Sequence, residues 1–224
     1  MRAIQQSPAA LMRTASRYPQ RHGTLDASLS RGVTAVGLAV AAIIIATPAL
    51  AHTGGSIAGG LAGGFAHPLF GPDHIVAMVA VGLWGAFLGA PAIWLLPIVF
   101  PVVMAFGGVI GILGIAIPWV EIGIALSAVV LGLMVAFGAR PPLVIAAVLV
   151  GAFAVFHGHA HGTELPAAVD AVAYSVGFVV ATGFLHLAGI AFGTLARWPA
   201  GRLAVRAAGG GIAVAGVIFL GLSG

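Results

Sequence analysis

Histidine and carboxylate side chains gather in two short segments of this 224-residue sequence. One of them, FHGHAHGTE, has His157 and His161 four residues apart and Glu164 three residues further on. A helix would place these three side chains along one stripe. Two imidazoles at this spacing with a carboxylate nearby are typical of a metal site.

The surroundings of this stripe leave alternatives open. His159 would point elsewhere on the same helix, where it is a candidate for supporting the site or capturing the ion. Gly158 and Gly162 also permit a tight loop, so a loop chelate is equally compatible with the sequence. A solvated histidine-rich loop without a metal is the remaining alternative.

The other segment, HPLFGPDH, places His67 seven residues before His74, with Asp73 next to the second imidazole. Seven residues are close to two helical turns, so both histidines would share a face of an unbroken helix. The intervening proline and glycine residues predict instead a broken helix, with the next span beginning near Pro72 or Asp73. Such a break suits an ion site, because freed carbonyls and converging side chains line it. The alternative is a simple helix N-terminus with an acid in its first turn.

Two further polar residues lie in apolar surroundings. Glu121, at the start of a predicted span, is a candidate third contributor to the ion site, with an interfacial acid as the alternative. His186 lies within a span, where we expect a hydrogen bond to a neighbouring carbonyl rather than a proton relay.

The sequence has no cysteine, and imidazole with carboxylate suits nickel, cobalt or zinc better than copper(I).

These side chains must be positioned by a scaffold within a membrane. The sequence is 61% hydrophobic and 6% charged, whereas soluble domains carry roughly 25% charged residues. Its apolar stretches run for about 20 residues without alternation, which predicts an α-helical bundle rather than a β-barrel. We therefore expect an all-α integral membrane protein.

Residues 1–51 have the pattern of a cleavable secretory signal peptide. Five of the nine basic residues lie within the first 31 positions, and an apolar run from Val33 leads to Pro48 and a small-residue exit. Cleavage after Ala51 would leave a mature chain that begins at His52. A retained first transmembrane helix is the alternative.

The remaining residues, 52–224, are interpreted as one transmembrane domain with six spans. The Gly-rich piece 54–74 is too interrupted for a span of its own and is interpreted as a half-helix or re-entrant approach to the first span. The predicted spans lie near 68–89, 92–117, 120–138, 142–158, 168–195 and 203–222.

The charges support this topology and an orientation. After residue 51 the chain has four arginines and four acids, so its net charge is zero and no nucleic-acid partner is expected. The arginines fall in the loops after the third and fifth spans, which the positive-inside rule assigns to the cytoplasm. The acids fall on the other side, as do most of the histidines. We expect a multi-pass membrane protein with the mature N- and C-termini outside the cytoplasm.

The sequence resembles the HupE/UreJ family of bacterial nickel or cobalt permeases in two long motifs. The first is HPLFGPDHIVAMVAVGLWGA, from His67 to Ala86, and the second is FHGHAHGTELP, from Phe156 to Pro166. The leader that ends in ALA and the six-span plan are similar too. The resemblance thus covers essentially the whole mature chain.

This resemblance implies secondary uptake of divalent nickel, or cobalt, across the inner membrane for hydrogenase or urease maturation. The metal would be a transported substrate, and the resemblance implies no enzymatic activity and no resident cofactor. The implied partners are the metal ion and the lipid bilayer, and the Gly-rich spans are compatible with a homo-oligomer. By motif position, a role in transport is implied for His67, Asp73, His74, His157, His161 and Glu164.

The sequence also bears on energy coupling and on rival functions. It has no phosphate-binding loop of the G-x-x-x-x-G-K-[ST] type and no lysine, so uptake would use an ion gradient, the membrane potential or a separate subunit. One rival is a membrane-anchored metal-binding protein or metallochaperone without translocation. The other is a haem-binding membrane electron carrier, which the grouping of histidines at one membrane edge disfavours.

Overall fold

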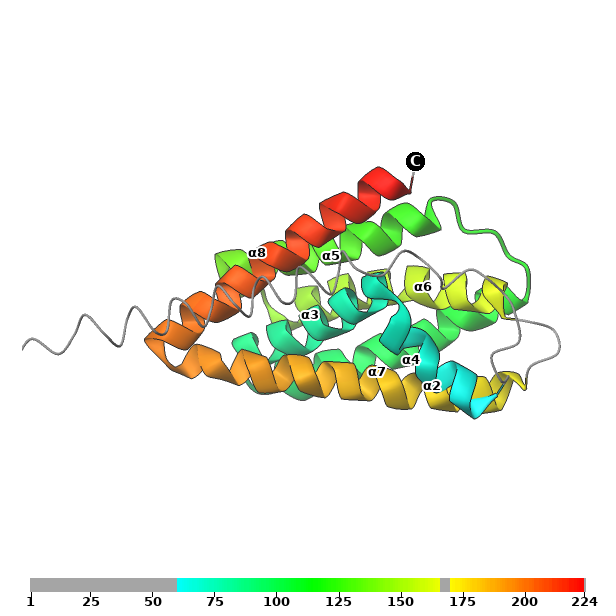
Figure 1. The fold of residues 1–224 in the computed structure, drawn as a ribbon, viewed down its shortest axis with the longest axis horizontal. Helices are drawn as coiled ribbons and strands as arrows, with labels where there is room; N and C mark the ends of the chain where they lie inside the picture. Colours follow the sequence, from blue (N-terminus) through cyan, green and yellow to red (C-terminus); the bar gives the residue numbers. More distant parts are fainter. Residues whose placement is uncertain (1–59, 166–169, 224) are drawn as a thin grey trace, which may run out of the picture. The chain divides into compact units, whose positions relative to one another are not determined.

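The structure, a computed structural model, describes residues 60–165 and 170–223, and the predicted signal peptide lies outside them. Within these ranges the chain is helical and forms no strand (Figure 1). The helices are α2 (Leu61–Phe70), α3 (Pro72–Leu88), α4 (Ala92–Ile112), α5 (Val120–Phe137), α6 (Leu143–Glu164), α7 (Ala171–Gly193), the short η3 (Thr194–Arg197) and α8 (Pro199–Leu222).

Five of these helices are long and apolar enough to cross a membrane, namely α4, α5, α6, α7 extended by η3, and α8. Helices α2 and α3 pass the same test only as a pair, and the pair is bent by 82° at a short break. The all-helical membrane class is therefore confirmed, with five or six spans in the described part of the chain. The count of six itself stays a prediction.

The break between α2 and α3 lies at Gly71. Pro72 is the first residue of α3, where a backbone N–H is not needed, and Gly71 before it is extended, with φ −85° and ψ 109°. The structure thus differs from the predicted continuous span 68–89, whose first residues belong to α2. Helix α2 is the half-helix that the Gly-rich sequence indicated.

Three other boundaries differ from the sequence-based prediction. Helix α4 ends at Ile112, and Gly114 beyond it has φ 72°, a left-handed conformation that ends helices. Helix α6 continues past 158 to Glu164. Helix α8 begins at Pro199 rather than near 203, because a proline fits the first turn of a helix.

Helices α4 and α6 pack closely, and glycines allow their backbones to approach. A Cβ atom at Gly158 would overlap the carbonyl of Met104, and one at Gly162 would overlap the carbonyl of Gly108. Lipid tails are as apolar as the side chains, so the hydrophobic effect does not drive helices together within a membrane. Close packing of this kind stabilises the bundle instead. The glycines of the FHGHAHGTE motif therefore belong to a continuous helix, and the alternative of a loop chelate is wrong.

Helix α3 carries many of the most buried side chains. It packs against α2, α4, α5, α7 and α8, and Met78, Leu83 and Trp84 are almost completely buried. Gly82 lies against the carbonyl of His186 on α7, where a Cβ atom would overlap that oxygen. This packing leaves little freedom to the first turn of α3, which carries His74.

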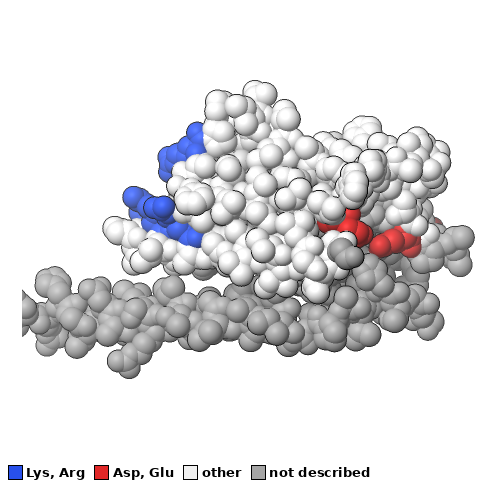
Figure 2. Space-filling model, turned by 90° about the horizontal axis from the view of Figure 1, so that it is seen from above, with Lys and Arg blue, Asp and Glu red and all other residues white. Residues whose placement is uncertain are grey.

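Opposite charges occupy opposite ends of the described helices. Figure 2 shows arginine side chains gathered at one end and acidic side chains towards the other. At the arginine end, Arg206 donates from Nε to the carbonyl of Ala136 (2.7 Å), and the guanidinium of Arg140 lies 5.0 Å from the centre of the Phe87 ring. The histidine segments lie with the acids, at the start of α3 and the end of α6.

Candidate metal centre

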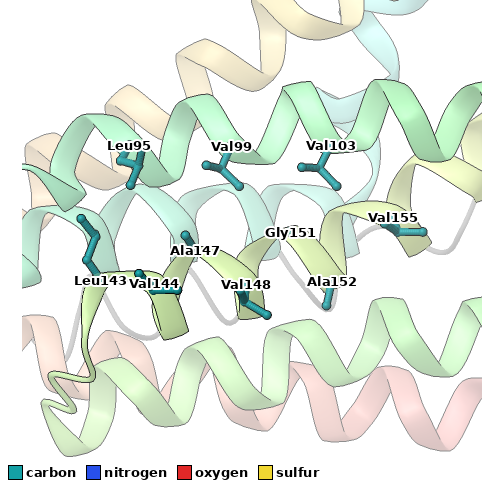
Figure 3. A pocket seen from close by; sticks show the side chains of 10 residues that line it. All are labelled: Leu95, Val99, Val103, Leu143, Val144, Ala147, Val148, Gly151, Ala152 and Val155. Atoms are coloured by element: carbon teal, nitrogen blue, oxygen red, sulfur yellow. The ribbon is translucent and has the colours of Figure 1, made fainter.

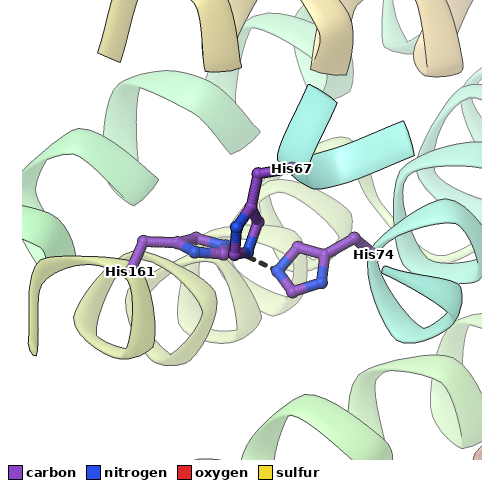
Figure 4. A group of neighbouring side chains, drawn as sticks. All are labelled: His67, His74 and His161. Carbon is purple, nitrogen blue, oxygen red and sulfur yellow. Dashed lines mark hydrogen bonds between the residues drawn. The ribbon is translucent and has the colours of Figure 1, made fainter. Parts of the chain in front are cut away.

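Three histidines from three helices converge at the acidic end (Figure 4). His67 comes from the last turn of α2, His74 from the first turn of α3, and His161 from the last turn of α6. One ring nitrogen from each lies within 4.8 Å of those of the other two. The 82° bend brings His67 back towards His74, so the two histidines meet from different helices rather than along one face.

Asp73 fixes the orientation of the His74 ring. The Nδ1 atom of His74 lies 2.9 Å from Oδ1 of Asp73, and because a carboxylate only accepts, the imidazole donates. The other nitrogen, Nε2, then faces His161 at 2.5 Å. A carboxylate that binds one imidazole nitrogen and frees the other is a common arrangement around protein-bound metals.

The three histidines line a small cavity of about 40 Å³. Since one water needs roughly 10–15 Å³, this space admits a cation that has lost most of its hydration shell. Carboxylates on three different helices surround it and offset positive charge. The residues that line it are His67, Asp73, His74, Glu121, Ile124, Ala160, His161 and Glu164.

His157 lies one turn before His161 on α6 and is completely buried. Its ring centre is 5.3 Å from that of His74. Ser127 Oγ donates to the carbonyl of Ile124 (2.6 Å) and so accepts from Nε2 of His157 (3.0 Å). The Nδ1 atom of His157 has no hydrogen-bond partner in the part of the chain that the structure describes. His157 therefore adjoins the cluster of three without belonging to it.

His159 points away from the cavity, as the helical spacing predicts. Its Nε2 atom donates to the carbonyl of Ile115 in the connection between α4 and α5 (2.8 Å), and the side chain is buried. The structure thus brings seven of the eight candidate residues to the cavity or beside it, and places His159 apart. The hydrogen bond of His159 links α6 to the connection that precedes Glu121.

Sequence reasoning missed two side chains at this site. The Phe178 ring on α7 lies 4.4 Å from the His161 ring, centre to centre, and covers the cluster from that side. Ser127 orients His157. The sequence could have identified Ser127 as a candidate, because it is a hydroxyl residue within an apolar span. Nothing in the sequence distinguishes Phe178 from the other aromatic residues of the spans.

A larger hollow between α4 and α6 offers no such chemistry. It measures about 440 Å³ and is lined by aliphatic side chains and one glycine (Figure 3). Leu95, Val99 and Val103 line it on α4, and residues between Leu143 and Val155 line it on α6. With no ligand-type side chain, it is not a candidate for metal binding.

Comparisons with known proteins identify the family of this chain. The sequence model of the family described as HupE / UreJ protein matches residues 38–219. Protein HupE of Rhizobium leguminosarum bv. viciae is 49% identical over 177 residues, which cover 79% of this chain and 93% of that protein. No solved structure matches significantly. The chain is thus a multi-pass membrane protein that belongs to the HupE/UreJ family.

Proposed function

We propose that this protein takes up divalent nickel, with cobalt as the alternative ion, by secondary transport. The observation that carries the proposal is the cavity in which His67, His74 and His161 meet, surrounded by carboxylates. The ion is a transported substrate, and the cluster of three histidines is its first binding site within the bundle.

The donor set supports a borderline divalent cation. Nitrogens that share one ion at about 2.1 Å each lie roughly 3–4 Å from one another, so the three imidazoles need only small adjustments from their present separation. Neutral imidazole suits nickel, cobalt and zinc, and a site without thiolate or thioether ligands does not favour copper(I). Asp73, Glu121 and Glu164 offset the charge of a dication.

The charge distribution supports the direction of transport. The arginine end is assigned to the cytoplasm by the positive-inside rule, which leaves the histidine cavity and both mature termini on the periplasmic side of the inner membrane. An inside-negative potential favours movement of a dication from that side, by about 4.6 kcal/mol per 100 mV. Membership of the HupE/UreJ family supports the further proposal that the metal serves hydrogenase or urease maturation.

The size of the cavity disfavours a haem carrier. Pockets for cofactors of that size measure roughly 300–1,000 Å³, whereas the space between the histidines measures about 40 Å³. A membrane-anchored protein that binds metal without moving it would use the same ligands. Only a measurement of flux separates that alternative from a transporter.

The test is accumulation of radioactive nickel, and separately cobalt, in bacterial cells that lack their own importers. Wild type is compared at matched expression with His74→Ala, His161→Ala and the control Ser175→Ala, an exposed α7 residue whose hydroxyl bonds its own helix. Uptake that both histidine substitutions abolish and the control retains would support a transporter. No uptake by wild type, with nickel still bound to the purified protein, would favour the anchor.

A further inference from the structure

A second group of polar side chains lies deeper in the bundle and is not used by the site described above. Thr182 and His186 are four residues apart on one face of α7, and both are almost completely buried. Within the residues that the structure describes, neither Oγ1 of Thr182 nor Nε2 of His186 has a hydrogen-bond partner. Buried polar atoms are rarely left unpaired, so these two call for an explanation.

The depth of this pair follows from the packing of α3 on α7. Gly82 lies against the backbone of His186. Gly82 is eight residues after His74 on α3, which corresponds to about 12 Å along the helix. His186 is therefore displaced from the histidine cavity towards the arginine end, within the membrane-spanning part of the helices.

The backbone of α4 provides a hydrogen-bond acceptor beside His186. Helix α4 contains Pro97 and Pro101, and because Pro101 has no N–H, the carbonyl of Pro97 loses its helical hydrogen bond. The Pro97 backbone lies within hydrogen-bonding reach of the His186 ring. A carbonyl that accepts from one imidazole nitrogen leaves the other with its lone pair, as at metal-bound histidines. Nε2 of His186 is that other nitrogen.

Phe100 contacts both His157, beside the outer site, and His186. Its fully buried ring lies 5.5 Å from the ring of His157 and 5.7 Å from that of His186, centre to centre. His157 adjoins His74 on the other side. The order of contacts is therefore His74, His157, Phe100 and His186, with unpaired nitrogens on the histidines before and after the phenyl ring.

We propose that His186 and Thr182 form an inner binding site that receives the divalent cation from the outer histidine cluster, that the Pro97 carbonyl orients the His186 ring, and that the Phe100 ring is the barrier between the two sites. This inference rests on the transport function proposed above. The ion exchanges ligands in turn, and the Phe100 ring must move aside for it to pass. No covalent or redox step is involved.

The test uses the purified full chain, in detergent and in proteoliposomes, with Ni²⁺ as the probe. Thr182→Val removes the hydroxyl at nearly constant volume, Thr182→Ser retains it, and His186→Ala removes the imidazole. Thr194→Val is the matched control, because it makes the same chemical change at a partly exposed threonine whose hydroxyl donates to the carbonyl of Ala191 at the end of α7. Equilibrium dialysis counts the bound ions, flux measures transport, and thermal unfolding checks the fold.

We expect Thr182→Val and His186→Ala to bind Ni²⁺ at the outer site with wild-type affinity, to lose the second, weaker bound ion, and to transport roughly 10- to 100-fold more slowly. Thr182→Ser and Thr194→Val should behave as wild type. If Thr182→Val is correctly folded, transports at the wild-type rate and binds as many ions as wild type, the proposed inner site is contradicted. This holds even if His186→Ala does not fold. If wild type shows no flux, the proposed transport function is contradicted. The inner site is then tested by the ion count alone: it is supported if wild type binds one more ion than Thr182→Val, and contradicted if the two bind equally.

Discussion

The Nε2 atoms of His74 and His161 lie 2.5 Å apart, although the residues are 87 positions apart in the sequence. Two bare lone pairs would repel at this separation, so one proton is held between the two nitrogens. With both rings neutral, the Nδ1–H of His74 is donated to Asp73, and the shared proton is then that of His161. A cation that uses both Nε2 atoms as ligands must displace this proton.

Binding of nickel should therefore move this proton to Nδ1 of His161, which has no hydrogen-bond partner among the described residues, and should release protons only where the histidines are protonated beforehand. Because metal and proton compete for the same imidazole nitrogens, affinity should fall as the pH is lowered and the histidines become protonated. Titration calorimetry of the purified protein in buffers of different ionisation enthalpy, repeated at several pH values, measures the protons released. An apparent enthalpy that is identical in all buffers at every pH, with affinity independent of pH, would contradict binding through the imidazole nitrogens.

Asp73→Asn should separate the orienting role of this residue from its charge. The asparagine side-chain oxygen can still accept from Nδ1 of His74, whereas Asp73→Ala removes the acceptor as well. We expect nickel affinity to fall by roughly 10- to 100-fold in Asp73→Ala and by less in Asp73→Asn. Equal losses in the two variants, measured by equilibrium dialysis, would mean that the charge alone matters.

The sequence predicts the features of this site that depend on residues close together in the chain. It does not predict the contacts between histidines from different helices. His157, His161 and Glu164 follow helical spacing within one segment, and proline chemistry predicts the break before Asp73. Both depend on residues close in the chain, so sequence patterns reveal them. The meeting of His67 with His161 depends on the angle of the α2–α3 bend and on which helix packs on which.

The glycines of the second motif illustrate the same limit. Gly158 and Gly162 are compatible with a loop or with a helix, because flexibility and close approach both favour glycine. The carbonyls of α4 lie against both glycines, and this close approach of the two backbones favours a helix in the second motif. The contact of His186 with Pro97 is equally long-range, because it joins helices α4 and α7.

Glu164→Gln should weaken nickel binding through loss of charge at the cavity. The carboxylate lines the cavity with Asp73 and Glu121, and a reduction of roughly tenfold corresponds to about 1.4 kcal/mol of interaction with the cation. Asp170→Asn is the control, because this acid lies at the same end and caps α7, and asparagine caps equally well. Equal affinities for the two variants would mean that Glu164 does not face the ion.

Gly158→Ala should disturb the site by forcing α6 away from α4. The added methyl group would overlap the carbonyl of Met104, which belongs to rigid helical backbone, so α6 must shift and carry His161 with it. We expect a loss of about 1–3 kcal/mol in stability, seen as a lower unfolding temperature, together with reduced nickel uptake. Gly183→Ala on α7 meets no atom within 4 Å and should stabilise its helix slightly, by up to about 1 kcal/mol. Since both substitutions improve helix propensity, a difference between them isolates the steric contact. Equal stability and uptake in the two variants would show that the α4–α6 contact does not position the histidines.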